Sequence, residues 1–370
     1  MSHPRRSLLM RGLGALAIVL TLLVSLAAGA SAKLGPGGTV YSLTNDASGN
    51  ALIVFHRAND GTLTQLEMVS AGGLGTGTGL GSQGAVIVSD DGQWVFAVDA
   101  GSNQVSSFAI TPYGPELVSV VDSGGMMPTS VTQSGNLLYV LNAGGDGNIS
   151  GFSIDKTGTL TALDNSTRPL SGSATNPAQI SFTQDGRTLI VAERATNSID
   201  TYRVDSHGIP GDPNVQVSSG PVPFGFAIDR FGHLIVSEAG TNTVSSYGID
   251  RWTGNLSVIG ASLVTNQLAP CWVTIAGNGR YVYTTDAASN AITGYRIIPN
   301  GNLILLNQNG LTASTGAHPT DMATGANGRF LYARNSDGTI SAYRVGNDGS
   351  LSPLAGISGL PASAAGLAGN

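Results

Sequence analysis

The stretch NPAQISFTQDGRTLIVAERATNSIDTYRV, residues 176–204, contains three short strand patterns in succession. The first ends at a turn on Asp185-Gly186, the second covers Thr188 to Ala192, and the third covers Ser198 to Val204 around the aromatic Tyr202. Short runs rich in Ile, Val, Thr and aromatic residues, bounded by Gly, Asp, Asn or Pro, are typical of antiparallel strands. The stretch therefore predicts one antiparallel sheet.

The same pattern returns along the whole chain. The aromatic at the Tyr202 position recurs about every 48 residues, and a period of that size made only of short strands indicates one propeller blade per repeat. The copies of this aromatic are Phe55, Phe108, Phe152, Tyr202, Tyr247, Tyr295 and Tyr343. A polar residue precedes the third strand of each copy, namely Asn50, Asn103, Asn148, Asn197, Asn242, Asn290 and Asp337.

The two ends of the repeat array complement one another. The first copy begins with the second-strand pattern Thr39-Val40-Tyr41-Ser42, and the chain ends shortly after Leu360-Pro361-Ala362-Ser363, which resembles the start of an opening strand. A closed ring leaves no strand edge unpaired. We therefore predict an all-β, seven-bladed β-propeller of four-stranded antiparallel blades. Residues 33–370 form its single domain, and the C-terminal segment supplies the inner strand of the first blade.

Residues 1–32 have the pattern of an export signal. Arg5, Arg6 and Arg11 precede an apolar run from Leu13 to Ala28, and Ala30-Ser31-Ala32 offers a cleavage site. This arrangement is typical of a secretory signal peptide, so we expect a secreted or periplasmic/extracellular protein. The apolar run is shorter than the ~20 residues of a membrane-spanning helix. An uncleaved anchor and a twin-arginine signal are the alternatives.

One face of the predicted ring gathers polar side chains. In a four-stranded blade the second strand ends at the face where the first strand begins, and we call this face the mouth. The residues at the second-strand ends are Asn45, Asp99, Asn142, Glu193, Glu238, Asp286 and Asn335. Such side chains also cap local turns, which is the alternative to a binding role. Glu is a poor turn former, so both interpretations stay open for Glu193 and Glu238.

Composition narrows the kind of partner. The chain has a formal net charge of −6 and no basic stripe, unlike a nucleic-acid-binding protein, and we expect a monomer.

Its one cysteine, Cys271, excludes an internal disulfide and is expected to be a small buried hydrophobe. The histidines show no ligand spacing, so we expect no metal and no cofactor. Calcium bound by carboxylates at the mouth is the alternative.

Three segments resemble the lactonase family of seven-bladed β-propellers, which groups 6-phosphogluconolactonase-like and carboxymuconate-cyclase-like proteins. They are VAERATNSIDTYRV (191–204), NAGGDGNISGF (142–152) and HPTDMATGANGRFLYARNSDGTISAYRV (318–345). The resemblance extends over residues 39 to 370. It implies a catalytic Glu at a second-strand end, which Glu193 matches by register, with His and Arg nearby. This chain departs from the family where those His and Arg are expected, since it has Ala178-Gln179 and Ser82-Gln83-Gly84 there.

The resemblance implies a protein that hydrolyses or forms the lactone of a small sugar acid or carboxylated ring at the mouth. The predicted catalytic residues are Glu193, Glu238 and His318, with a carboxylate activating water and His318, Arg194 or Arg334 stabilising the oxyanion. The predicted substrate-binding residues are Arg194, Asp99, Asn142, Asp286, Asn335 and Arg334. The alternative is a non-catalytic extracellular propeller that binds a protein or a polysaccharide.

Overall fold

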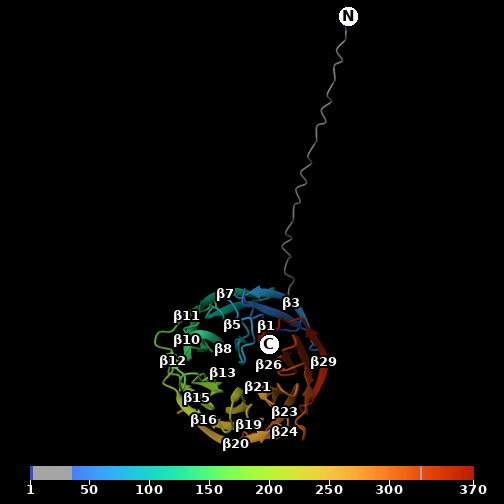
Figure 1. The fold of residues 1–370 in the computed structure, drawn as a ribbon. Helices are drawn as coiled ribbons and strands as arrows, with labels where there is room; N and C mark the ends of the chain where they lie inside the picture. The colour runs from blue at the N-terminus through green and yellow to red at the C-terminus, as the bar shows by residue number, and fades with distance from the viewer. Residues whose placement is uncertain (3–35, 326) are drawn as a thin grey trace. The chain divides into compact units, whose positions relative to one another are not determined.

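The computed structural model describes residues 1–2, 36–325 and 327–370, and these form strands joined by turns and loops. Thirty strands make up seven antiparallel sheets, which follow one another around a ring from blue to red (Figure 1). The predicted signal peptide falls, apart from its first two residues, outside the described residues. Within the described part of the chain, no helix is long and apolar enough to cross a membrane.

The first three blades are built as predicted, from the inner strand outward. Their strands are β30 (Ala365–Gly369), β1 (Gly38–Leu43), β2 (Ala51–Arg57) and β3 (Leu63–Ser70) in blade 1; β4 (Val86–Val88), β5 (Trp94–Asp99), β6 (Gln104–Thr111) and β7 (Gly114–Asp122) in blade 2; and β8 (Met126–Ser134), β9 (Leu137–Gly144), β10 (Asn148–Ile154), β11 (Leu160–Ala162) and β12 (Arg168–Pro169) in blade 3.

The other four blades continue the ring. Their strands are β13 (Pro177–Phe182), β14 (Thr188–Glu193), β15 (Ser198–Arg203) and β16 (Asn214–Val217) in blade 4; β17 (Pro223–Ile228), β18 (His233–Glu238), β19 (Thr243–Ile249) and β20 (Leu256–Val264) in blade 5; β21 (Pro270–Ala276), β22 (Tyr281–Asp286), β23 (Ala291–Ile297), β24 (Leu303–Leu305) and β25 (Ala313–Ser314) in blade 6; and β26 (Pro319–Gly325), β27 (Phe330–Asn335), β28 (Thr339–Val345) and β29 (Leu351–Ser358) in blade 7. In blades 3 and 6 the outermost strand is split in two, and both parts pair with the same neighbour.

The C-terminal strand closes the ring, which confirms the predicted closure. β30 pairs antiparallel with β1, and Tyr41 lies opposite Ala368. The backbone N–H of Thr39 donates to the side-chain oxygen of Asn370 at 2.7 Å, and the N–H of Asn370 donates back to the carbonyl of Thr39 at 3.1 Å. The first and last segments of the propeller thus share one sheet.

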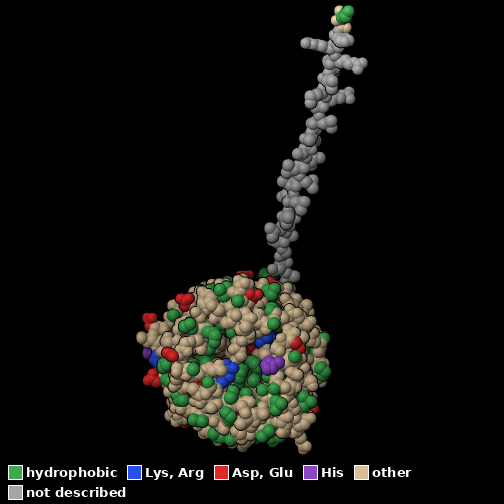
Figure 2. Space-filling view, viewed as in Figure 1, with side chains coloured by type: hydrophobic (Ala, Val, Ile, Leu, Met, Phe, Trp, Pro, Cys, Tyr) green, Lys and Arg blue, Asp and Glu red, His purple; other side chains and the backbone are tan. Residues whose placement is uncertain are grey.

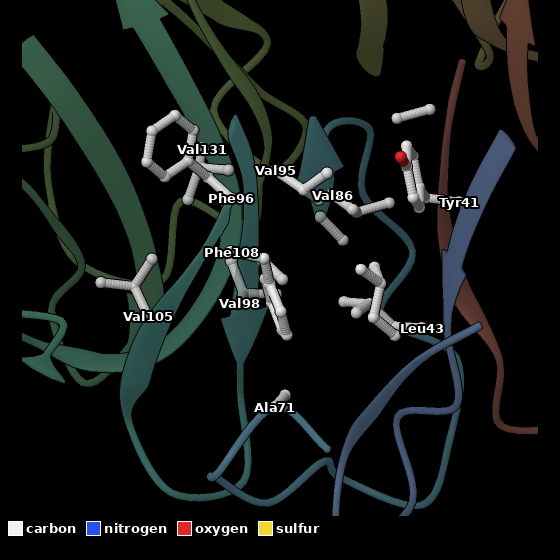
Figure 3. Packing of buried hydrophobic residues seen from close by; sticks show 14 of the residues in the cluster. Tyr41, Leu43, Ala71, Val86, Val95, Phe96, Val98, Val105, Phe108 and Val131 are labelled. Atoms are coloured by element: carbon white, nitrogen blue, oxygen red, sulfur yellow. The ribbon is translucent and has the colours of Figure 1, made fainter. Parts of the chain in front are cut away.

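The core lies between the blades. The recurring aromatics that define the repeat are all buried. Figure 3 shows part of one cluster, in which Tyr41 and Leu43 of β1 lie opposite Val86 of β4 and Val98 of β5. Because each sheet buries both faces against its neighbours, close packing between blades supplies the main stabilisation of the ring.

The recurring Asn before the third strand ties neighbouring blades together at the mouth. Asn103, Asn197, Asn242 and Asn290 all have positive φ. Their side-chain oxygens accept hydrogen bonds from the backbone N–H groups of Met127, Val222, Ala269 and His318 in the following blades. Each of these four donors also has positive φ and directly precedes a proline, which in blades 5, 6 and 7 is the first residue of the inner strand. Asn tolerates this backbone region better than most residues, which explains its recurrence.

Candidate active site at the mouth of the ring

The predicted mouth exists, because the second strands end where the inner strands begin. Pro177 pairs with Glu193, Pro223 with Glu238, Pro270 with Asp286 and Pro319 with Asn335. Near the centre of the face in Figure 2, basic side chains and a histidine lie beside hydrophobic side chains.

The two glutamates at the second-strand ends are buried and hydrogen-bonded to the loop that enters their blade and to the turn or strand that follows them. Glu193 accepts hydrogen bonds from the backbone N–H of Ser171 at 3.0 Å, from the hydroxyl of Ser171, and from the hydroxyl of Thr196 at 2.6 Å. Glu238 accepts from the Gly220 N–H at 2.8 Å and from the Thr243 hydroxyl at 2.6 Å. Neither side chain is exposed, so these contacts support a structural role, and catalysis by either carboxylate stays a prediction.

Four further second-strand ends share one rule: the side chain bonds a hydroxyl on the third strand of its blade. The pairs are Asp99 with Ser106, Asn142 with Ser150, Asp286 with Thr293 and Asn335 with Ser341. Burial raises the pKa of Asp99 to about 6 and that of Asp286 to about 7. The hydrogen bonds from hydroxyl groups lower both pKa values but by less. These contacts support the turn-capping alternative, and a substrate-binding role for the four residues stays a prediction.

Blade 4 breaks this rule with a second carboxyl group. Asp200 occupies the third-strand position of those hydroxyls and is fully buried beside Glu193. Burial, and then the hydrogen bond and negative charge of Glu193, raise the pKa of Asp200 to about 8. The acidic side chain next to Glu193 is thus Asp200 of its own blade.

Arg194 is the predicted residue that does reach the mouth. Its guanidinium carbon lies 4.9 Å above the centre of the Phe224 ring, and its Nε and Nη2 donate to the carbonyl and side-chain oxygens of Asn176 at 3.0 and 2.6 Å. Its Nη1 has no hydrogen-bond partner among the residues that the structure describes. Phe224 packs in turn on Trp272, with ring centres 4.8 Å apart. Arg194 is therefore held in place through Nε, Nη2 and its contact with Phe224.

The floor of the mouth is a segment of the Gly-rich connection between β3 and β4. Its Gln83 side chain donates to the Val273 carbonyl at 2.7 Å and accepts from the Val273 N–H at 2.9 Å. The Gln83 N–H donates to the carbonyl of Ala178 at 2.9 Å, and Trp272 Nε1 donates to the carbonyl of Ser82 at 2.8 Å. Ser82-Gln83 of blade 2 thereby bonds blades 4 and 6 and crosses the central channel.

Below this crossing segment lies a cavity of about 400 Å³ lined by inner strands, including Gln83 and Asp321. One oxygen of Asp321 accepts from the N–H of Met322, and the other has no partner among the described residues. Burial, offset by the charge of Arg334, raises the pKa of Asp321 to about 7, and burial lowers the pKa of Arg334 to about 10. Arg334 lies opposite Asp321 on the neighbouring strand and is almost completely buried.

His318 is the predicted catalytic residue that stays open to solvent. It is exposed and stands just before β26, where its N–H bonds Asn290 at 2.7 Å. Cys271 is buried, as expected, and burial raises the pKa of its thiol to about 12, so it is a poor nucleophile. The sequence did not predict Phe224, Trp272 or the hydrogen-bonding role of Gln83. The only signal in the sequence for Phe224 and Trp272 is their place one and two residues after the inner-strand prolines Pro223 and Pro270.

Metal binding has little local support. Within residues 36–325 and 327–370, no group of three or more His, Cys, Asp or Glu side chains is placed to hold a metal ion. Calcium binds best to clustered oxygen ligands, whereas the carboxylates at the second-strand ends bond hydroxyl and N–H groups. The calcium-dependent alternative stays a prediction.

This geometry defines the class of protein: a closed seven-bladed β-propeller with one cationic site at its mouth. The chain matches the family described as "Lactonase, 7-bladed beta-propeller" over residues 36–171, 164–269 and 258–359. It therefore belongs to the lactonase family of seven-bladed β-propellers.

Relatives and solved structures agree with this family. The 6-phosphogluconolactonase of Yersinia pestis is 25% identical over 280 residues, 71% of this chain and 80% of that protein. The enzyme of the same name from Xenorhabdus nematophila is 35% identical over 99 residues, 26% of this chain but only 30% of that protein. The periplasmic gluconolactonase of Pseudomonas aeruginosa superimposes with a TM-score of 0.69 at 15% identity, over 89% of this chain and 99% of that chain. A likeness at this identity shows the fold alone.

Proposed function

We propose that this protein hydrolyses the lactone of a small sugar acid at the mouth of the propeller. Family membership and the names of the relatives support lactone chemistry. The observation that carries the proposal is Arg194, whose guanidinium is held over Phe224 with Nη1 unpaired among the described residues. A preorganised cation of this kind can stabilise the oxyanion that forms when water attacks an ester carbonyl.

His318 is our candidate for the general base. The two glutamates have no exposed surface, whereas His318 is exposed at the mouth. Imidazole is the side chain that most often moves protons in general acid–base catalysis. In the proposed reaction a water oxygen bonds to the lactone carbonyl carbon and its proton passes to His318. The ring C–O bond then breaks, and the ring oxygen takes up a proton to give the open hydroxy acid.

We propose an unphosphorylated sugar-acid lactone as the substrate. Arg194 is the arginine that we place at the open mouth, since Arg334 is buried. A phosphate group carries close to two negative charges near neutral pH and is usually held by several donors. Export through the predicted signal peptide would also bring the enzyme to sugar acids outside the cell. No observation at the mouth favours the non-catalytic alternative over lactone hydrolysis there.

The test measures acid release from glucono-1,5-lactone by the purified mature protein, with spontaneous hydrolysis subtracted. We expect kcat/KM to fall ~10²-fold or more in Arg194→Gln, as when one oxyanion donor is removed, and by ~10²-fold or more in His318→Gln. Arg344→Gln, an exposed arginine on β28, serves as the control and should react like the parent. Equal rates for the parent and both mouth variants would refute the site.

A further inference from the structure

A second cleft lies on the face of the ring opposite the mouth. It has a volume of about 310 Å³ and is lined by parts of three turns: the β13–β14 hairpin, the β17–β18 hairpin and the end of β19. First strands end and second strands begin on that face. The cleft is therefore separate from the mouth, and the activity proposed above does not depend on it.

Two arginines in this cleft form no ion pair with a described carboxylate. Arg230 and Arg251 both line it and are exposed, and neither forms an ion pair with a carboxylate in the part of the chain that the structure describes. Asp185 is the one acidic side chain in the lining, so the lining carries a net charge of about +1 at neutral pH. Because the whole chain has a formal net charge of −6, this cleft is a local exception.

Both guanidinium groups are held by aromatic rings. The Arg230 guanidinium carbon lies 4.8 Å from the centre of the Phe231 ring, and that of Arg251 lies 4.5 Å from the centre of the Trp252 ring. Stacking of this kind restricts the side chain, so less conformational entropy is lost when a ligand binds. Phe231 and Trp252 are 50% and 64% exposed, which leaves ring surface for a ligand as well.

Two other Arg–aromatic pairs of the propeller differ in the exposure of the aromatic ring. Arg280 stacks on Tyr281 and Arg329 on Phe330, but both of these rings are buried in the core. In those pairs the ring stabilises the fold. Blade 5 instead exposes two large aromatic rings beside its arginines, although exposing such rings costs burial free energy.

We propose that this cleft binds a carboxylated sugar unit of an acidic polysaccharide. The ligand's carboxylate would bond the guanidinium groups of Arg230 and Arg251, since arginine matches the planar geometry of a carboxylate. The apolar face of the sugar ring would lie on Phe231. Asp185 and Gln184, which also line the cleft, would bond the sugar hydroxyls. The volume lies at the lower end of the range for small-ligand sites, which suits one or two sugar units.

The test is affinity electrophoresis of the mature protein in gels that contain polygalacturonate, dextran or no polysaccharide. We expect retardation by polygalacturonate and not by dextran. Arg230→Gln/Arg251→Gln should raise the apparent Kd at least ~10-fold, and Phe231→Ala should raise it by a smaller factor. Arg280→Gln removes an equivalent stacked charge in the next blade and should bind like the parent.

Three outcomes would overturn the proposal. They are no retardation of the parent, equal weakening in Arg280→Gln, or equal retardation by a sulfated polysaccharide, which would indicate attraction by charge alone. All substituted side chains, that of the control Arg280 included, are exposed, and far-UV circular dichroism checks the fold of each variant. Hydrolysis of glucono-1,5-lactone should be unchanged in the cleft variants. A failed lactonase assay would therefore leave the polysaccharide result interpretable.

Discussion

Asp200 stands where the third strands of five other blades carry a hydroxyl, namely Ser106, Ser150, Ser245, Thr293 and Ser341. The pKa of Asp200 is raised to about 8 in the folded protein, above the ~3.9 of an unfolded Asp. The folded state therefore binds the proton more tightly than the unfolded state. The contribution of Asp200 to the free energy of unfolding must then fall as pH rises from about 4 to about 8, and it stays low above pH 8.

The substitution Asp200→Ser restores the hydroxyl of the other blades and should remove this loss. We expect a higher Tm than the parent at pH 8.5 and little difference at pH 5, because the parent's Asp200 is protonated at the lower pH. Removing an unpaired buried carboxylate is worth ~1–3 kcal/mol, which calorimetry can resolve. Thr293→Asp is the matched control, since it creates a second acid pair with Asp286 and should lower Tm at pH 8.5. A parent Tm that rises between pH 5 and pH 8.5 relative to Asp200→Ser would contradict this account.

Glu193 separates the structural from the catalytic interpretation of the second-strand ends. The Glu193 carboxylate is buried, bonded to Ser171 and Thr196, and adjacent to Asp200. We therefore expect Glu193→Gln to keep lactone hydrolysis within ~3-fold of the parent, and to lessen the loss of Tm at high pH by removing one negative charge from the pair. If instead turnover disappears while the fold is retained, Glu193 is the base predicted from the family register and His318 is not.

At the scale of single elements, the Gly-rich connection between β3 and β4 has the largest effect on the site. Its Ser82-Gln83 segment makes hydrogen bonds to blades 4 and 6 and closes the channel beneath the mouth. Without this segment, the mouth would be continuous with the cavity at Asp321. A short, fixed floor favours a small ring-shaped substrate.

Gln83→Ala should loosen this floor without unfolding the ring. The variant loses two side-chain hydrogen bonds to Val273, each worth ~1 kcal/mol net. We expect a modest fall in Tm and faster hydrogen exchange at the Val273 amide, which Gln83 caps in the parent at 2.9 Å. Gln133→Ala is the control, because its side chain bonds the hairpin at Asp90 of the preceding blade and its own hairpin at Gly135, and not Val273. Unchanged exchange at Val273 would mean that the crossing segment does not hold the channel closed.

Sequence predicted the elements better than it predicted the site. Alternating apolar residues, hairpin glycines and the recurring aromatic are local signals, and they placed β14 and β15 within a residue of their observed bounds. The direction of a polar side chain at a strand end is not local. Glu193 turns toward Ser171 and Arg194 toward Asn176, and those partners come from loops whose paths the repeat does not specify.

At the scale of the whole molecule, ring closure rests on the last strand. β30 joins β1; its buried Leu367 packs in the cluster between blades 7 and 1, and its buried Ala368 packs in the cluster between blades 1 and 2. Deleting residues 365–370 would expose the backbone edge of β1, and free strand edges promote aggregation. It would also remove buried apolar surface worth ~25 cal/mol per Å².

We expect the truncated protein to lose most of its thermal stability or to aggregate, as measured by the melting transition and by light scattering. Asn370→Ala, which removes only the side-chain bond to Thr39, should lower Tm slightly and stay monodisperse. The contrast between these two variants isolates strand pairing from the terminal hydrogen bond. A truncation that melts with the parent and stays monodisperse would show that blades 7 and 1 hold the ring closed without β30, since their direct contacts would then suffice against the entropy of opening the ring.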